Sequence, residues 1–158
     1  MSGRITKSEE QLRGDPKHND KVLSRFINCV MKDGKKSVAM RVVYGAFDEI
    51  EKRTKGEPKA IDVFHKALSR VRPEVEVRSK RVGGANYQVP MQVNRRRQQS
   101  LAFRWIIDAA RGDRGKPMST RLARELLDAS KGEGKAVSTR EQTHRMADAN
   151  KAFAHFAW

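Results

Sequence analysis

Apolar residues recur every three or four positions along most of the chain, and short polar or glycine-rich segments separate these runs. This spacing places the apolar side chains on one face of a helix, so the pattern predicts about six helices. Glycine and proline mark most boundaries, because glycine favours helix ends and proline cannot continue a helix. The predicted helices run from near Asp20 to Gly34, from Ser37 to just before Gly56, from Pro58 to Pro73, from about Arg95 to Arg111, from about Ser119 to Gly132, and from Ser138 toward the C-terminus.

The fourth of these helices is the most apolar. Measured from Trp105, its apolar residues cover more than half of the circumference, so we expect a central and mostly buried helix. The sixth begins with Ser-Thr-Arg-Glu at residues 138–141, a capping-box sequence that favours a helix start at Ser138. On the first helix, Cys29 lies next to the apolar stripe. Since free cysteines are usually buried, we expect it to be a core thiol.

Between the third and fourth helices the apolar period changes to two, which is typical of β-strands. Val75 and Val77 alternate with charged residues, and a second row follows at Tyr87, Val89, Met91 and Val93. Pairing Val77 with Met91 brings both rows onto one face and leaves residues 83–85 as a three-residue loop. A lone two-stranded ribbon is marginal in water. We therefore expect a projecting arm that is ordered mainly by what it binds.

The predicted fold is mainly α: a single-domain bundle of about six helices over residues 1–158, with a two-stranded antiparallel β-hairpin arm at residues 73–94 between helices three and four. Residues 1–19 are polar and predict a flexible basic arm that a partner could order, with plain terminal disorder as the alternative. The N-terminal sequence lacks the apolar segment of a signal peptide, and one cysteine agrees with a reducing compartment. A cytoplasmic location is expected.

Charge narrows the choice of partner. The chain has 34 Lys and Arg residues against 19 Asp and Glu residues, which gives a net charge of +15, far above the ~2–8 that solubility asks of a small domain. From Val77 to Ile107 there is no acidic residue. Such one-sided charge indicates a polyanion, with nucleic acid first and an acidic membrane surface second. No basic segment carries an apolar stripe long enough to insert into a bilayer, so no membrane partner is expected.

No pattern in the sequence favours catalysis, a metal or a cofactor. The four histidines lack zinc-site spacing, and one cysteine cannot form a structural zinc site. A nucleophile set of Cys29, His144 and Asn150 can be written down, but Cys29 has no cationic neighbour in the apolar stripe to lower its pKa. Residues 34–37 resemble the end of a phosphate-binding loop, yet the glycine required at position 29 is missing. A nuclease is the remaining enzymatic alternative, and its carboxylates would come from Asp48, Glu49, Glu51 and Asp108.

Basic residues also gather outside the hairpin. Lys35 and Lys36 lie in a turn between helices, where they could reach a phosphate backbone or simply be solvated. Three arginines at positions 95–97 oppose the positive end of the helix dipole, a conflict that a bound phosphate would remove. Arg104 lies on the narrow polar stripe of the same helix. On the sixth helix we expect a basic side, opposite Met146, Ala149 and Phe153, that carries Arg140, His144 and Lys151.

Longer motifs run through the chain: Asp15-Pro16-Lys17, GKKSVAMRVVY from Gly34, RPEVEVRSKRVGGANYQVP from Arg72, LAFRW from Leu101, RLARE from Arg121 and HRMADANKAFAH from His144. By these motifs the chain, from about Asp15 to its end, resembles the bacterial form of the family of the seventh small-subunit ribosomal protein. The resemblance implies a helical body with a projecting hairpin, and no enzymatic activity. It also implies direct binding to the 3′ major domain of small-subunit rRNA, where the family helps nucleate assembly of the head.

The resemblance further implies neighbours on the subunit interface. These are the exit-site tRNA, the mRNA path, and small-subunit ribosomal proteins nine and eleven. Carried to matching positions, it implies rRNA contacts at Lys17, Lys35, Lys36, Arg72, Arg78, Lys80, Arg81 and Arg97. Their charge and their places on the fourth and sixth helices add six more candidate rRNA contacts: Arg95, Arg96, Arg104, Arg140, His144 and Lys151. The hairpin tip would lie nearest tRNA and mRNA, and it consists of Val82, Gly83, Gly84, Ala85, Asn86 and Tyr87. A DNA-architectural protein with a basic β-arm is the alternative with the same electrostatics.

Overall fold

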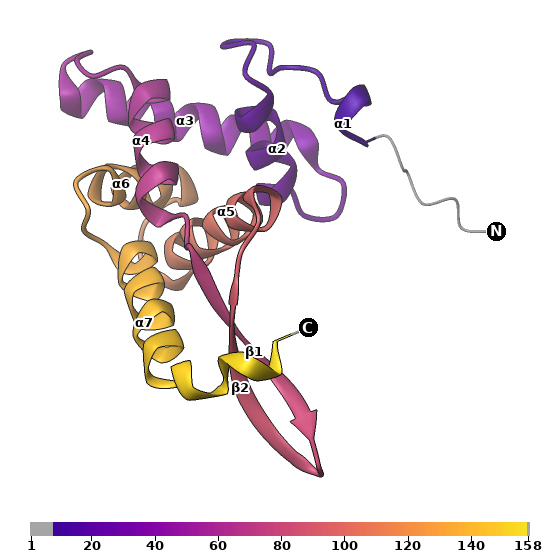
Figure 1. Cartoon of the computed structure of the whole chain (residues 1–158). Coiled ribbons are helices and arrows are strands. Elements are labelled where there is room, and N and C mark those ends of the chain that lie inside the picture. Colours follow the sequence, from indigo (N-terminus) through magenta and orange to yellow (C-terminus); the bar gives the residue numbers. More distant parts are fainter. Residues whose placement is uncertain (1–7, 158) are drawn as a thin grey trace.

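The computed structural model describes residues 8–157 as a helical bundle from which one β-hairpin projects (Figure 1). Six helices of ten residues or more occur in this range, as the apolar periodicity predicts. The elements in order are α1 Ser8–Gln11, α2 Lys21–Val30, α3 Lys36–Thr54, α4 Ala60–Val71, β1 Val75–Val82, β2 Ala85–Gln92, α5 Arg95–Gly112, α6 Met118–Ser130, α7 Lys135–Ala149 and the 3₁₀ helix η1 Lys151–Phe156.

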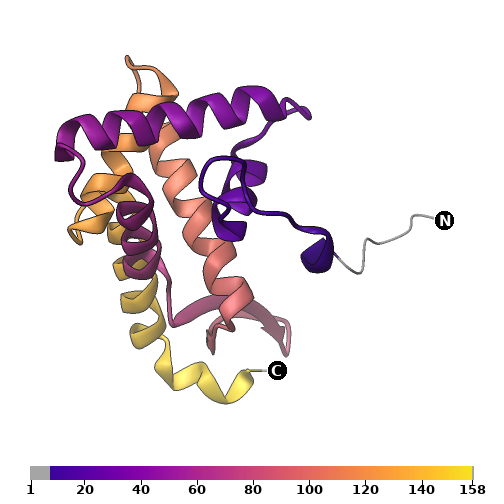
Figure 2. The same cartoon turned by 90° about the horizontal axis from the view of Figure 1, so that it is seen from above.

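The core lies between α2, α3, α4, α5 and α6, with the first turn of α7 added at one end. Helix α5 runs through the middle of the bundle (Figure 2). Phe26, Phe64 and Phe103 meet in the core, and the ring centroid of Phe26 lies 5.2 Å from that of Phe64 and 5.3 Å from that of Phe103. Both pairs are edge-on, the arrangement that aromatic quadrupoles favour. The apolar stripes of the sequence therefore converge on one shared core.

Trp105 and Cys29 are less buried than the sequence predicts. Trp105 is half-buried at the edge of the core, because the buried stripe of α5 is centred on Ile106. Cys29 is exposed, so the prediction of a core thiol is wrong. It lies about a quarter of a turn from the centre of the buried stripe that Leu23, Phe26 and Val30 define. A residue beside an apolar stripe is buried only when a neighbouring element reaches over it.

Two of the long helices begin with a side-chain cap. The Asp20 side chain accepts a hydrogen bond from the backbone N–H of Leu23 at α2, and Asn94 accepts one from Arg97 at α5. Each bond satisfies a donor that the first turn of a helix leaves without an intrahelical partner. The sequence predicts both starts to within a residue.

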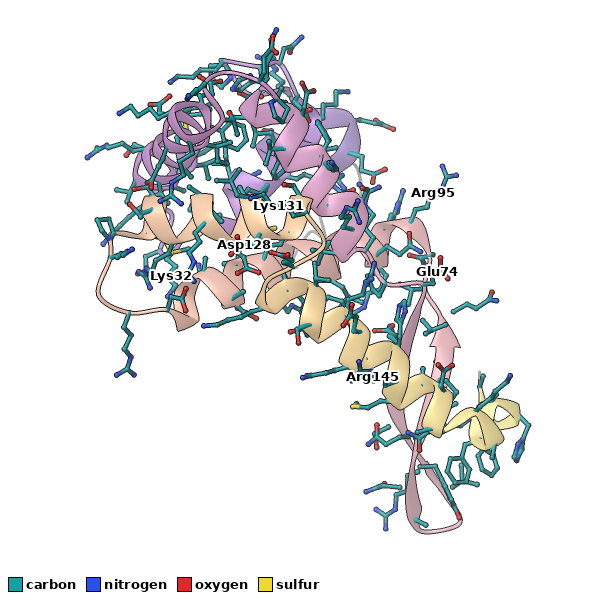
Figure 3. All side chains as sticks on the ribbon, turned by 90° about the vertical axis from the view of Figure 1, so that its left-hand side faces the viewer. Lys32, Glu74, Arg95, Asp128, Lys131 and Arg145 are labelled. Atoms are coloured by element: carbon teal, nitrogen blue, oxygen red, sulfur yellow. The ribbon has the colours of Figure 1, made fainter. Side chains whose placement is uncertain are left out.

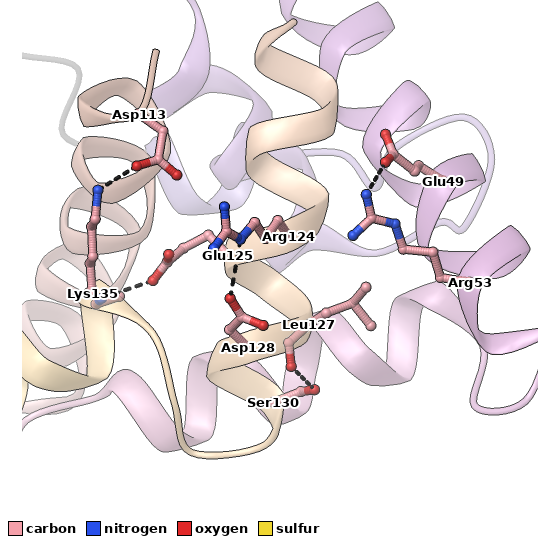
Figure 4. Close-up of polar contacts among 10 residues, drawn as sticks. Glu49, Arg53, Asp113, Arg124, Glu125, Leu127, Asp128, Ser130 and Lys135 are labelled. Carbon is pink, nitrogen blue, oxygen red and sulfur yellow. Dashed lines mark hydrogen bonds and ion pairs between the residues drawn. The ribbon is translucent and has the colours of Figure 1, made fainter. Parts of the chain in front are cut away.

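Helix α7 begins at Lys135 rather than at Ser138, so the predicted capping box is wrong. Its first turn is capped from outside the helix, because the Glu125 carboxylate of α6 accepts a hydrogen bond from the Ala136 N–H at 2.8 Å. Figure 4 shows Glu125 reaching the start of α7 beside the Asp113–Lys135 ion pair. Gly134 precedes the helix with φ +94°, and a Cβ there would lie 3.0 Å from Glu125 Oε1. Glycine is required at this close approach.

Glu125 is buried, with 5% of its surface exposed. Burial raises the pKa of its carboxyl, and the nearby Asp128 and Asp113 act in the same direction. The Ala136 N–H and Lys135 act in the opposite direction but do not cancel the burial. The cap therefore couples the start of α7 to a titrating group inside the bundle.

The hairpin register differs by one residue from the predicted one. Val77 faces Pro90 and Glu76 faces Met91, and the turn consists of Gly83 and Gly84 alone. The two glycines have φ of +58° and +87°. Positive φ at both central residues allows the two-residue turn whose twist matches a hairpin, and this turn is preferred to the expected three-residue loop.

One residue of register moves an entire side-chain row to the other face. The apolar row of β2, which contains Val89, therefore lies on the same face of the hairpin as the charged row of β1. The sequence predicts that it shares a face with Val75 and Val77 instead. On this shared face Glu76 lies opposite Met91, Arg78 opposite Val89, and Lys80 opposite Tyr87. Glu76 and Val89 are the buried members.

The C-terminal segment packs on the hairpin, and Figure 1 shows η1 crossing it about halfway along its length. The Tyr87 ring lies 5.1 Å from the rings of both Phe153 and Phe156. Lys80 Nζ donates a hydrogen bond to the Phe156 carbonyl at 2.7 Å. The hairpin therefore projects as predicted, but its middle is held by the chain's own tail.

The described part of the N-terminal segment is fixed to α3 by a buried carboxylate. Asp15 is 3% exposed and accepts hydrogen bonds from the N–H groups of Lys17, His18 and Asp20 and from the Tyr44 hydroxyl at 3.0 Å. Burial raises the pKa of Asp15, but the four hydrogen bonds outweigh it and lower the pKa below its usual value. Burial and the Asp15 contact raise the pKa of Tyr44 to about 12. The first seven residues of the predicted flexible arm lie outside the described residues.

Candidate nucleic-acid interface

The hairpin base is organised by one buried acid that holds two arginines. Glu76 Oε1 pairs with Arg78 at 2.7 Å, and Glu76 Oε2 pairs with Arg97 at 3.2 Å. The Glu76 side chain is only 10% exposed, while those of Arg78 and Arg97 are 45% and 36% exposed. The acid is thus desolvated, and the guanidinium groups keep donors directed outward. Glu76 joins β1 to the start of α5 and leaves a net positive pair at the junction.

The start of α5 presents three consecutive arginines with different partners. Arg97 binds Glu76, and Arg96 binds Glu9 of α1 at 2.9 Å. Arg95 is exposed and has no partner among residues 8–157; Figure 3 shows it at the edge of the molecule above the hairpin. The carboxylates of Glu9 and Glu76 therefore compensate two of the three positive charges at the positive end of the helix dipole. Arg95 remains available to bind an external anion.

The hairpin tip carries cationic and small residues into solvent. Arg81 is exposed and makes no ion pair within the described part of the chain. Gly83, Gly84, Ala85 and Asn86 are exposed, whereas Tyr87 packs against η1. Val82 is half-buried. The tip therefore offers backbone and an amide side chain to a partner, and its aromatic ring is turned toward the tail.

Helix α7 lies with Arg140 and His144 toward the body and with Met146 toward solvent. His144 Nε2 accepts a hydrogen bond from the Glu74 N–H at 3.2 Å, and Arg140 Nη1 donates to the Arg70 carbonyl at 2.5 Å. Met146 is 51% exposed, and Lys151 is exposed at the start of η1. The sequence predicts that this helix has an apolar and a basic side, but not which side packs on the body. Either side can pack, because the Met146 side chain and the aliphatic part of the Arg140 side chain both offer apolar surface.

Arg72 and Arg140 each have a buried Nε with no hydrogen-bond partner in the described range. Arg72 follows α4 directly and Arg140 reaches the end of the same helix, so both lie near the base of the hairpin. Neither forms an ion pair among residues 8–157. Their charges are uncompensated locally, which adds to the positive potential beside Glu76 and α5.

Lys17, Lys35 and Lys36 lie on a different part of the bundle. Lys17 Nζ lies 4.5 Å from the centre of the Tyr44 ring, a cation–π distance. Lys36 lines a cleft of about 500 Å³ beside Asp15, and Lys35 lines one of about 280 Å³ with Arg111 and Arg121. Arg111 is at the C-terminal end of α5 and Arg95 at its start, a separation of about 24 Å along the helix axis. The predicted cations therefore form two separate groups.

Arg104 lies on the exposed side of α5 and, with Arg25, acts to lower the pKa of the Cys29 thiol, although partial desolvation of this surface thiol raises that pKa more. His144 is hydrogen-bonded to Glu74 at the hairpin base, and neither His144 nor Asn150 is among the residues that surround Cys29 beside Arg25 and Arg96. A thiol raised in pKa is a poor nucleophile at neutral pH. Cys29, His144 and Asn150 are therefore not brought together as a nucleophilic set.

The acids considered for a nuclease are ordinary surface residues. Asp48, Glu51 and Asp108 are exposed, and Glu49 pairs with Arg53 at 2.5 Å (Figure 4). In the described part of the chain, no group of three or more His, Cys, Asp or Glu residues could hold a metal ion. No helix in that part has an apolar stretch of the length needed to cross a bilayer.

Sequence reasoning missed a groove between α2 and the start of α5. Its volume is about 240 Å³, and its lining includes Arg25, Arg96, Gln99 and Phe103. Gln99 Nε2 is buried there without a hydrogen-bond partner in the described range. No signal in the sequence marks Arg25 or Gln99, because each is one polar residue on an amphipathic helix.

A basic helical bundle with a projecting hairpin and two separate groups of cations defines a nucleic-acid-binding protein. A family model described as Ribosomal protein S7p/S5e matches residues 2–151, and the chain belongs to that family. It is similar to the small ribosomal subunit protein uS7 of Rhodopirellula baltica, 62% identical over 156 residues and 99% of both chains. It is also similar to the uS7 proteins of Hyphomonas neptunium and Magnetococcus marinus, 56% and 54% identical over the full length of both chains.

Family membership confirms the resemblance read from the motifs. The chain is a ribosomal protein of the small subunit, a structural component rather than an enzyme, and its place is the ribosome in the cytoplasm. Binding to rRNA is general to this family. The hairpin motif and the sixth-helix motif carry the resemblance, and they build the two sides of the hairpin base.

Proposed function

We propose that this protein binds the 3′ major domain of small-subunit rRNA directly and nucleates assembly of the head. The observation that carries the proposal is the positive hairpin base. Arg78 and Arg97 share one buried acid, Glu76, and Arg72 and Arg95 have no acidic partner among residues 8–157. An rRNA junction, which presents phosphates at several angles, fits cations supplied by β1, α5 and the end of α4 better than a straight duplex does.

A second group of cations supports binding to folded RNA. Lys35 lies beside Arg111 at the other end of α5 from Arg95, and Lys36 follows it at the start of α3. A ligand that contacts both groups must span about 24 Å and bend around the bundle. A junction of several helices meets this requirement, and the two groups would then hold two of its helices in a fixed relation. This is the physical sense in which one protein can nucleate a larger fold.

The main rival is a DNA-architectural protein with a basic β-arm. Such arms insert an apolar wedge between base pairs to bend the duplex. The tip here has Gly83, Gly84, Ala85 and Asn86, and its one large ring, Tyr87, packs on η1. The absence of a wedge among these tip residues favours RNA.

Binding of the full-length protein to a head-domain rRNA fragment and to a DNA duplex of equal length tests the proposal. We expect the rRNA fragment to bind more tightly at moderate salt, and Arg81→Ala and Arg95→Ala each to weaken it. Both side chains are exposed, so melting should be unchanged. Lys52→Ala, an exposed cation on α3, is the control and should leave affinity nearly unaltered. Equal affinity for the rRNA fragment and the DNA duplex would count against the proposal.

We further propose that the hairpin tip lies beside the exit-site tRNA and the mRNA path, with ribosomal proteins nine and eleven as neighbours. The exposed Gly83 to Asn86 turn supports a role in close backbone approach, because it has no bulky side chain. A photo-crosslinker placed at Asn86 in assembled subunits should label tRNA or mRNA, and one at Met146 is the matched control. Labelling of rRNA alone from Asn86 would contradict this placement.

A further inference from the structure

Glu9 bridges two arginines that come from different helices. Its Oε1 lies 3.1 Å from Arg25 of α2, and its Oε2 lies 2.9 Å from Arg96 at the start of α5. Figure 2 shows α1 beside this end of the bundle. A carboxylate that spans two guanidinium groups occupies the position that a phosphate takes when arginines bind it. Here the acid is supplied by the chain itself.

The two arginines also line the groove between α2 and α5. The groove has a volume of about 240 Å³, and Gln99 lines it with a buried Nε2 that lacks a partner among residues 8–157. A buried donor without an acceptor costs free energy, and an oxygen ligand in the groove would remove that cost. Arginine donors and an amide donor together favour an oxyanion.

The bridge is exposed enough to be exchanged. The side chains of Glu9, Arg25 and Arg96 are 47%, 32% and 80% exposed. Ion pairs with this exposure are weak, because water and salt compete with them. A polyanion that carries many phosphates at once can therefore displace one carboxylate from this position.

We propose that Arg25, Arg96 and Gln99 form a phosphate site for the RNA backbone, and that Glu9 occupies it until RNA binds. The inference rests on the proposed function, since it adds a site to the same interface. Glu9 then acts as an internal competitor. Every RNA that places a phosphate in the site must first displace this acid, so the acid lowers the affinity of each such complex.

Glu9→Gln tests this, because it removes the charge and keeps the size of the side chain. Binding is measured on the head-domain rRNA fragment and on a random-sequence RNA duplex of equal length. We expect affinity for both to rise about 2- to 10-fold at low salt, and the gain to shrink as salt screens the competing ion pairs. The gain should be similar for the two RNAs when each places a phosphate in the site, because displacing Glu9 costs both of them the same free energy.

Glu57→Gln is the matched control, since it changes the net charge equally. Glu57 is exposed in the α3–α4 connection, at the other end of the molecule from α1 in Figure 1. Its effect on affinity should be small. In the Arg25→Gln, Arg96→Gln background, Glu9→Gln should give no gain, because the charges that Glu9 holds are gone. A gain that persists there, or one equal to that of Glu57→Gln, overturns the phosphate site.

The outcomes separate this inference from the proposed function. If the wild-type protein prefers the rRNA fragment but Glu9→Gln behaves as Glu57→Gln does, only the phosphate site fails. If the wild-type protein binds the rRNA fragment and the random duplex equally, the proposed rRNA target fails. The same Glu9, Arg25 and Arg96 variants, measured on the duplex, then still decide whether the groove binds phosphate.

Discussion

The helical bundle and the hairpin end are stabilised in different ways. In the bundle, Phe26, Phe64 and Leu68 are fully buried, and the core continues through five helices. In the two eight-residue strands only Glu76 and Val89 are buried. The bundle is held by apolar burial, which is strong and non-directional. The hairpin is held by a shared acid, a carbonyl contact and an aromatic tail, so its position is set by a few specific groups.

This difference assigns separate roles to the two regions. A surface that binds a polyanion needs many cations, and their mutual repulsion destabilises the folded state. The bundle provides stability that does not depend on those cations. The repelling cations lie at the hairpin end, where the ion pairs of Glu76 and the packing of η1 hold the strands in place. Variants in one region should therefore affect stability, and variants in the other should affect order at the hairpin.

The largest effect is expected from Phe64→Ala in the bundle. Phe64 is 0% exposed and its ring contacts Phe26 and Phe47. The loss of the ring and the cavity left behind should lower the free energy of unfolding by ~3–5 kcal/mol in urea titrations. Trp105→Ala is the comparison and should cost less, because Trp105 is half-buried. Equal costs would mean that the edge of α5 is packed as tightly as its centre.

The next effect is expected from Glu76→Ala at the hairpin base. Removing a nearly buried acid leaves Arg78 and Arg97 close together and unpaired, which should cost ~1–2 kcal/mol because both guanidinium groups are partly solvated. Hydrogen exchange should show faster opening of β1 and β2 while the core amides of α4 keep their protection. Glu76→Gln should cost less, because the amide oxygen still accepts hydrogen bonds. A uniform loss of protection in both regions would show that they are one cooperative unit.

A smaller effect is expected from Phe156→Ala in the tail. It removes one ring from the cluster with Tyr87 and Phe153, which should cost ~0.5–1.5 kcal/mol and speed exchange at the hairpin amides. Bundle amides should not change. Ala154→Gly, at an exposed position of the same 3₁₀ helix, is the control for tail flexibility. Unchanged exchange in the hairpin after Phe156→Ala would mean that η1 does not order it.

The smallest effect is a pH dependence at Glu125. Its pKa is raised in the folded protein by burial, so its contribution to stability is present below the ordinary glutamate pKa and is lost as pH rises through the raised value. Glu125→Gln keeps an acceptor for the Ala136 N–H and cannot ionise. Melting temperatures of the two proteins should agree in acid, and the variant should be equal or higher at pH 7. A lower melting temperature for the variant at pH 7 would show that the charge strengthens the cap.

The sequence by itself determines the helices and the chemistry of the surface. The boundaries of α5 and the start of α2 follow from apolar spacing and from Asp20 and Asn94, because these signals are local. The acid-free stretch from Val77 to Ile107 and the hairpin motif are sufficient to indicate a polyanion partner. Periodicity and charge are properties of residues that are close in the sequence, so they do not depend on how the rest of the chain folds.

Only the tertiary structure decided how those elements are turned and joined. The hairpin register depended on the backbone of Gly83 and Gly84, the start of α7 on Glu125 from another helix, and the exposure of Cys29 on what packs beside it. The Glu9 bridge joins residues 16 and 87 positions away. Such contacts are formed by side chains that share no local pattern. They exist only because burial of the core brings distant segments to the same place.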